Sequence, residues 1–215
     1  EIGNWKCTSM LIKICGLTRA QDVRLCQDLG VDLLGFIFHA SSPRRVDPET
    51  VAAFPQDKAM RVGVFVRHSV ARIRAVRNRA GLDLVQLHGA YTPAQCAALD
   101  PESVIKVFWP ERYAGPDALS RELERFAPCC RYFLFDAGQV GGGHGRSWRV
   151  EWFRELEIPR PWLLAGGVCA ENVQNFIQAF KPDGIDMNSG VENAPGVKNT
   201  ENLGLSVRTI TRRPI

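Results

Sequence analysis

The sequence predicts an α/β fold, a (β/α)8 TIM barrel that forms a single domain over residues 10–215. Short apolar runs rich in β-branched and aromatic residues recur at fairly regular spacing, and segments of helical periodicity separate them. This alternation implies right-handed βαβ crossovers and a parallel sheet. A chain of 215 residues that is 45% hydrophobic can bury one large core, and barrels of this length still form one domain.

Each apolar run gives one expected strand, and helices follow from capping and proline signals. The first helix has Thr18 as its N-cap and Gly30 as its C-terminal stop, and a later helix over residues 171–180 ends before Pro182. Prolines mark the starts of further helices, where a missing N–H costs little, at Pro48, Pro93 and Pro116. The expected strands are Leu11–Cys15, Leu33–Phe38, Val62–Val66, Leu84–Leu87, Val104–Phe108, Tyr132–Phe135, Trp162–Ala165 and Gly184–Met187.

An open, doubly wound sheet is the alternative architecture. A dinucleotide-binding sheet would carry the pattern GxGxxG directly after its first strand. Only Cys15-Gly16-Leu17-Thr18 stands there. The barrel is therefore favoured.

Composition and charge limit the classes of partner that this protein is expected to bind. The net charge of +4 is mild, and the cluster of arginines over residues 72–79 alternates with Val70, Ile73 and Val76 at helical spacing. This pattern indicates a solvated helix face and no nucleic-acid partner. No apolar run approaches the roughly 18 residues of a membrane span, so we expect no membrane partner.

The seven cysteines are odd in number and have no CxxC spacing. This argues against a disulfide framework and against a zinc site, and it favours a reducing compartment. We therefore expect a cytoplasmic protein with no metal. Residues 1–9 precede Met10 and are interpreted as a tag, an extension or a linker remnant outside the barrel.

Chemically active side chains and glycine turns follow the expected strands. In a barrel the carboxyl ends of the strands share one rim, where active sites lie. Backbone N–H groups at glycine turns can cradle a phosphate dianion, and barrels often bind phosphate near the last strands. The rim residues are Cys15, Arg44, His88 and Asp136, with candidate phosphate-binding residues Gly143, Gly145, Gly166, Gly167, Ser189 and Gly190.

The ordered set of motifs resembles the phosphoribosylanthranilate isomerase family of tryptophan biosynthesis over nearly the whole chain. The resemblance implies a cofactor-free Amadori rearrangement of N-(5-phosphoribosyl)anthranilate to 1-(2-carboxyphenylamino)-1-deoxyribulose 5-phosphate. The motifs are Lys13-Ile-Cys-Gly-Leu-Thr18, Gly35-Phe-Ile-Phe38 with Ser42-Pro-Arg44, Val62-Gly-Val-Phe-Val66, Val85-Gln-Leu-His-Gly89, Asp136 with its glycine loop, Leu164-Ala-Gly-Gly167 with Glu171-Asn-Val173, and Ser189-Gly-Val-Glu192 with Pro195-Gly196.

By motif match, Cys15 resembles the general base, Asp136 the general acid, and Arg44 the group that meets the anthranilate carboxylate. His88 is either a substrate contact or a structural histidine. The expected partner is a small phosphoribosyl substrate, and we expect a monomer, with fusion to or association with a neighbouring pathway enzyme left open. The chain departs from the family pattern at His144, at Arg146, at Ser147-Trp148-Arg149, at Asn188 and at Asn199.

Two demands follow from this chemistry. Cys15 must reach the thiolate below the ordinary thiol pKa of about 8.5, and Asp136 must hold a proton above the ordinary carboxyl pKa of about 3.9. Side-chain alternation puts Lys13 on the face of Cys15, one layer below it, where a lysine needs an anionic partner. We expect an interior network of Lys13, Lys106 and Asp186.

Two other functions remain alternatives. One is a related phosphosugar-barrel isomerase, which is expected to use a carboxylate where this chain has Cys15. The other is a non-catalytic barrel that binds a phosphoribosyl ligand. Retention of both Cys15 and Asp136 argues against it.

Overall fold

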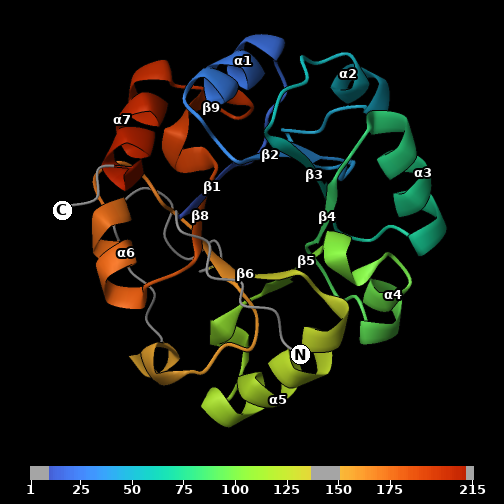
Figure 1. The fold of residues 1–215 in the computed structure, drawn as a ribbon, viewed down its shortest axis with the longest axis vertical. Coiled ribbons are helices and arrows are strands. Elements are labelled where there is room, and N and C mark those ends of the chain that lie inside the picture. Colours follow the sequence, from blue (N-terminus) through green and yellow to red (C-terminus); the bar gives the residue numbers. More distant parts are fainter. Residues whose placement is uncertain (1–9, 137–150, 212–215) are drawn as a thin grey trace.

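The structure is a computed structural model that describes residues 10–136 and 151–211. Each parallel strand is hydrogen-bonded to the next, and β8 closes on β1, so the strands form a closed barrel in sequence order. Figure 1 shows the helices as a ring around it. The predicted barrel is confirmed. The strands are β1 (Leu11–Ile14), β2 (Leu33–Ile37), β3 (Met60–Phe65), β4 (Leu84–Leu87), β5 (Val104–Phe108), β6 (Tyr132–Asp136), β7 (Trp162–Ala165) and β8 (Gly184–Met187).

The outer layer consists of α-helices with short 3-10 turns between them. The helices are α1 (Ala20–Asp28), α2 (Pro48–Ala52), α3 (Val70–Ala80), α4 (Pro93–Ala97), α5 (Pro116–Phe126), α6 (Val173–Phe180) and α7 (Thr200–Thr211). The turns are η1 (Pro101–Ser103), η2 (Pro110–Arg112), η3 (Ala127–Cys129), η4 (Glu151–Glu155) and η5 (Ser189–Val191), and β9 (Glu192–Ala194) pairs with β10 (Val197–Lys198) outside the barrel.

The helix starts follow the sequence signals, with one exception. The three prolines begin α2, α4 and α5 as predicted. The predicted N-cap Thr18 is wrong, because α1 begins after Arg19, and the Thr18 hydroxyl donates instead to the Gly196 carbonyl at 2.6 Å. A tertiary hydrogen bond across the chain has replaced the local cap. In α3, Ile73 and Val76 are buried as predicted, which confirms the arginine-rich side as the outer face.

Apolar side chains fill the barrel in two separate cores. One core lies between the strands and the helices, and the other lies inside the barrel. The interior set has one or two members from each of the strands β1 to β7 and supports the rim from below. It comprises Leu11, Leu33, Val62, Leu84, Ile105, Val107, Tyr132, Leu134, Leu163 and Ala165.

A buried ion pair lies among these interior side chains. β1 and β8 pair so that Lys13 is directly opposite Asp186, and the Lys13 Nζ donates to Asp186 Oδ1 at 2.9 Å. The two side chains are 0% and 7% exposed. The predicted interior contact between these two residues is confirmed.

The predicted place of Lys106 in this network is wrong. On β5 the side chains of Ile105 and Val107 occupy the barrel interior, so Lys106 points to the opposite face, toward the helices. There its Nζ donates to the Val107 carbonyl at 2.7 Å and to the Gly89 carbonyl at 3.3 Å. The side chains of β5 alternate as expected, but Lys106 lies on the outer face of the strand and not on the predicted inner face.

We predict that Lys13→Met lowers the free energy of unfolding by about 3–5 kcal/mol, because it leaves the Asp186 carboxyl buried without its cation. The double variant Lys13→Met/Asp186→Leu should recover most of this loss, since neither charge then remains in the interior. Urea unfolding of the wild type and both variants measures the effect. Equal losses in the single and double variants would contradict it.

An aromatic cluster supports β6 from the helical side. Phe135 is fully buried and contacts the rings of Phe108, Phe133, Phe153 and Trp162 at centroid distances of 5.8, 6.4, 4.8 and 5.4 Å. Because Phe135 directly precedes Asp136, this packing holds the end of the strand in place.

We predict that Phe135→Ala costs about 3–5 kcal/mol of stability, the usual range for deleting a buried phenyl ring. Leu205→Ala is the matched control, because Leu205 is 47% exposed and should change stability by less than about 0.5 kcal/mol. Denaturant unfolding of the two variants provides the comparison. A loss at Phe135 no larger than that at Leu205 would show that the cluster does not stabilise the fold.

Candidate active site

The carboxyl ends of the strands surround one cavity of about 1960 Å³. Its lining brings together the predicted site residues that the structure describes. They are Cys15, Arg44, His88, Asp136, Gly166, Gly167, Ser189 and Gly190. The predicted phosphate-binding residues Gly143 and Gly145 lie outside the described residues, as do His144 and Arg146.

Cys15 follows β1 and lies at the cavity, directly above the ion pair of the barrel interior. Its backbone N–H donates to the Met187 carbonyl at 2.8 Å, which ties the residue to β8, and its side chain is 5% exposed. Burial raises the pKa of the Cys15 thiol, and the nearby Lys13 amine opposes that rise. The expected lowering of this pKa is therefore wrong for the unliganded protein, because desolvation outweighs the positive charge.

The Lys13 amine interacts with both of its anionic neighbours. Its pKa is raised, since Asp186 and Cys15 together outweigh the opposing effect of burial. The Asp186 pKa is also raised, because burial outweighs the attraction of Lys13. The base of the cavity thus holds a thiol, an amine and a carboxyl group in direct electrostatic contact.

Gly35 on β2 allows this close packing. A Cβ atom at this position would lie 2.9 Å from the Cys15 Cα, 3.0 Å from its Sγ and 3.1 Å from the Lys13 Nζ. Any side chain would therefore displace the thiol or the amine. No role of Gly35 follows from the sequence alone, because this steric limit comes from a neighbouring strand.

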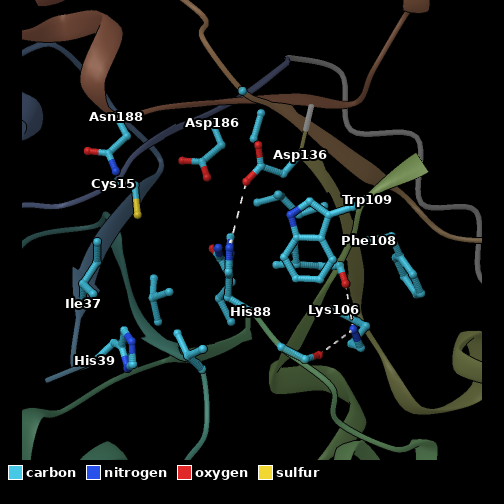
Figure 2. Close-up of a pocket in the computed structure, with 18 of the residues that line it drawn as sticks. Cys15, Ile37, His39, His88, Lys106, Phe108, Trp109, Asp136, Asp186 and Asn188 are labelled. Carbon is cyan, nitrogen blue, oxygen red and sulfur yellow. Dashed lines mark hydrogen bonds and ion pairs between the residues drawn. The ribbon is translucent and has the colours of Figure 1, made fainter. Parts of the chain in front are cut away.

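Asp136 ends β6 on another side of the same cavity, near His88 at the end of β4. The His88 Nε2 lies 4.0 Å from Asp136 Oδ2, and the two side chains are 32% and 22% exposed. Burial lowers the pKa of His88 to about 4, so the imidazole is neutral at neutral pH. Its ring packs edge-on against Trp109 at 5.0 Å. Figure 2 shows Cys15 and Asp136 on different sides of the cavity, with Asp186 between them in this view and His88 pointing toward Asp136.

Arg44 reaches the cavity but is held by a carboxylate. Its Nε lies 3.1 and 3.0 Å from the two Glu192 carboxylate oxygens, and its Nη2 donates to Oε2 at 2.6 Å. Lys198 Nζ donates to Glu192 Oε1 at 2.8 Å and to Asn188 Oδ1 at 3.2 Å. Although burial opposes it, the hydrogen bonds from Arg44 and Lys198 hold the pKa of Glu192 below its usual range.

Glu192 contacts Arg44 directly, and Lys198 contacts Glu192, but neither residue was among the site residues predicted from the sequence. Glu192 was part of a recognised motif, but its partner Arg44 lies far away in the sequence. Gln86 is a third omission. It lines the cavity, and its buried Oε1 has no hydrogen-bond partner among the described residues. The sequence did hold a signal for Gln86. It lies on β4 two residues before His88, and alternation puts both side chains on the inner face.

Two glycine turns form another part of the cavity wall. Gly166 and Gly167 have positive φ angles of 100° and 66°, a conformation that favours glycine. A Cβ atom on Gly190 would lie 2.1 Å from the Val168 carbonyl oxygen, so no side chain fits there. Ser189 and Gly190 lie in η5, next to this turn. Small residues thus leave the backbone of two adjacent loops open to a ligand.

One group of three side chains that could ligate a metal ion occurs among the described residues, and none of its members lines the cavity. It consists of Cys96, Cys129 and Cys130. In the same parts of the chain, the structure has no helix with the length and apolar character needed to cross a membrane.

Comparisons with known proteins agree with the predicted resemblance. The family model for N-(5'phosphoribosyl)anthranilate (PRA) isomerase matches residues 12–208. The N-(5'-phosphoribosyl)anthranilate isomerase of Maridesulfovibrio salexigens is 45% identical over 202 residues, covering 94% of this chain and 98% of that protein. The enzyme of the same name from Desulfovibrio desulfuricans is 44% identical over 206 residues, covering 95% and 97%.

Solved structures give the same result. The phosphoribosyl anthranilate isomerase of Thermus thermophilus has a TM-score of 0.80 at 32% identity and covers 93% of this chain and 98% of its own. A second isomerase structure, in complex with reduced 1-(o-carboxyphenylamino)-1-deoxyribulose 5-phosphate, has a TM-score of 0.77 at 26% identity and covers 94% and 98%. The chain belongs to the N-(5'-phosphoribosyl)anthranilate isomerase family.

Proposed function

We propose that this protein isomerises N-(5'-phosphoribosyl)anthranilate to 1-(2-carboxyphenylamino)-1-deoxyribulose 5-phosphate in tryptophan biosynthesis. The observation that carries the proposal is that Cys15 and Asp136, from the ends of β1 and β6, line one cavity. A thiol and a carboxyl group on different sides of one ligand suit a reaction that moves protons at neighbouring atoms.

Asp136 acts as the general acid. It gives a proton to the furanose ring oxygen, the bond between that oxygen and the anomeric carbon breaks, and the ring opens to an iminium ion. Cys15 then acts as the general base and removes the proton from the adjacent sugar carbon, which gives an enolamine. Tautomerisation of the enolamine gives the ketone, so the atoms balance without a redox partner.

Lys13 supports the base step. The resting thiol is protonated because its site is buried, so the thiolate forms only with help from a nearby cation. The Lys13 amine supplies that cation directly below the thiol, and Asp186 fixes the amine in place. Lys13 and Asp186 are therefore positioning residues in the proposed mechanism.

The remaining cavity groups bind the two anionic ends of the substrate. Arg44 meets the anthranilate carboxylate, and Glu192 orients its guanidinium. The turns at Gly166–Gly167 and Ser189–Gly190 take the phosphate, together with Gly143 and Gly145 of the loop after β6. Neutral His88 lies near Asp136 and contacts the sugar.

The runner-up functions receive less support. A phosphosugar isomerase with a carboxylate base does not account for the thiol beside Lys13. A non-catalytic ligand-binding barrel does not account for Asp136 and Cys15 at a common cavity. The expectations of a monomer, of association with a neighbouring pathway enzyme and of a cytoplasmic location stay predictions.

We predict that Cys15→Ser lowers kcat by about 10²–10⁴-fold, the usual contribution of a positioned proton-transfer group, and leaves the affinity for a product analogue nearly unchanged. Asp136→Asn should have a similar effect. A fluorescence assay that follows consumption of phosphoribosylanthranilate measures turnover. Cys26→Ser is the control, because Cys26 is buried in α1 away from the cavity. A folded wild-type protein without turnover would exclude the proposed function.

We also predict how the alkylation rate of Cys15 depends on pH. Iodoacetamide reacts with the thiolate, and a raised thiol pKa leaves less thiolate at any given pH, about tenfold less for each pH unit by which the pKa rises. The alkylation rate of Cys15 should therefore lie below that of free glutathione at pH 7 and rise without levelling off below about pH 9. Peptide mass spectrometry follows the residue. A plateau below about pH 8 would contradict the effect of burial.

A further inference from the structure

Three cysteine side chains converge outside the active-site cavity, between the strands and the helices. Cys96 comes from α4, Cys129 ends η3, and Cys130 lies between η3 and β6. Their sulfur atoms all lie within 4.8 Å of one another. The three side chains are 0%, 4% and 1% exposed. None of them takes part in the proposed isomerisation.

The fold brings these cysteines together through two separate segments. α4 is held by Pro93 at its first position and by a capping box between Thr92 and Gln95. On the other side, α5 continues into η3, and the Cys129 Sγ donates to the Phe126 carbonyl at 3.2 Å. Each segment is therefore fixed by its own contacts, and the cysteines meet where the two segments pack. Because the pair and the single cysteine are far apart in the sequence, their spacing does not indicate a common site.

A buried amine accompanies the sulfur atoms. Lys106 is 5% exposed, and burial lowers the pKa of its amine, while the nearby Cys96 and Cys130 oppose that effect. Carbonyl oxygens accept its hydrogen bonds, and the rings of Phe108 and Phe126 lie 4.8 and 5.2 Å from its Nζ. A buried lysine is costly without a compensating negative charge. Three neutral thiols supply none, whereas thiolates would.

We propose that Cys96, Cys129 and Cys130 form a thiolate site for one divalent thiophilic cation of the zinc class. Thiolates are the preferred ligands of such ions. On binding, the three S–H protons leave to solvent and three sulfur–metal bonds form. A divalent cation offsets two of the three thiolate charges, and a protonated Lys106 amine beside the site would offset the third. A monovalent cation would leave a net negative charge there.

The distances between the sulfur atoms fit this assignment. A metal–sulfur bond of about 2.3 Å in a tetrahedral site separates its sulfur ligands by about 3.8 Å. The sulfur atoms are already within 4.8 Å of one another, so binding needs a contraction of at most about 1 Å. Small rotations of the side chains supply such a movement. One coordination position stays available to a small exogenous ligand.

The test titrates Cd²⁺, a spectroscopic probe for zinc-class thiolate sites, into chelator-treated, reduced full-length protein. We expect a sulfur-to-cadmium charge-transfer band that saturates at one equivalent and is displaced by Zn²⁺. Zn²⁺ should also raise the Tm, because it binds the folded protein and joins α4 to η3. Cys96→Ala should weaken binding by at least about 100-fold, since even the loss of an outer partner costs about 10–100-fold.

The matched control is Cys26→Ala, which removes another fully buried helical cysteine and should keep the band and the Tm shift. Lys106→Met should weaken binding by about 10–100-fold through the lost charge balance. If Cys96→Ala does not fold, Cys130→Ser carries the test in its place. A wild type without the saturable band, or an equal loss of binding in Cys26→Ala, overturns the proposal. So does a count of five thiols instead of seven in protein that is denatured before any reductant is added, which would indicate a disulfide.

Discussion

The ion pair between Lys13 and Asp186 is the constraint on which the candidate active site depends. It forms where β8 closes on β1, so the first and the last strand of the barrel together build the base of the cavity. The pair is buried, and neither charge could remain there alone. The strand pairing that closes the barrel therefore also places the Lys13 amine below Cys15.

This arrangement sets the reactivity of the thiol through opposing effects. Burial disfavours the thiolate, while the Lys13 amine favours it, and the net result in the unliganded protein is a protonated thiol. Arg44 follows a similar principle, since Glu192, which also accepts a hydrogen bond from Lys198, holds the Arg44 guanidinium in place before a ligand arrives. Charged groups at the rim are thus fixed by their neighbours, and the glycine turns leave room for the ligand.

The sequence was sufficient for the architecture and for placing four candidate site residues at one rim, because periodicity and strand ends are local signals. Each predicted strand is present with ends within two residues, and Cys15, Arg44, His88 and Asp136 line one cavity. The errors concern properties that tertiary structure decides. The face of the sheet that Lys106 occupies depends on which residues of β5 point into the barrel. The direction in which the Cys15 pKa shifts depends on how deeply the thiol is buried. The role of Gly35 and the meeting of three cysteines arise only from packing between segments.

In the proposed reaction a sulfur and a carboxyl group act on neighbouring atoms of one bound aminosugar, with the phosphate on the glycine turns. A crystal structure of this protein with reduced 1-(o-carboxyphenylamino)-1-deoxyribulose 5-phosphate tests it most directly. The account predicts Cys15 Sγ and the Asp136 carboxyl group within about 3–3.5 Å of the reacting sugar atoms, on different sides of the sugar, with the anthranilate carboxylate toward Arg44. An analogue that lies away from Cys15, or a phosphate outside the turns at Gly166 and Gly190, would contradict the account.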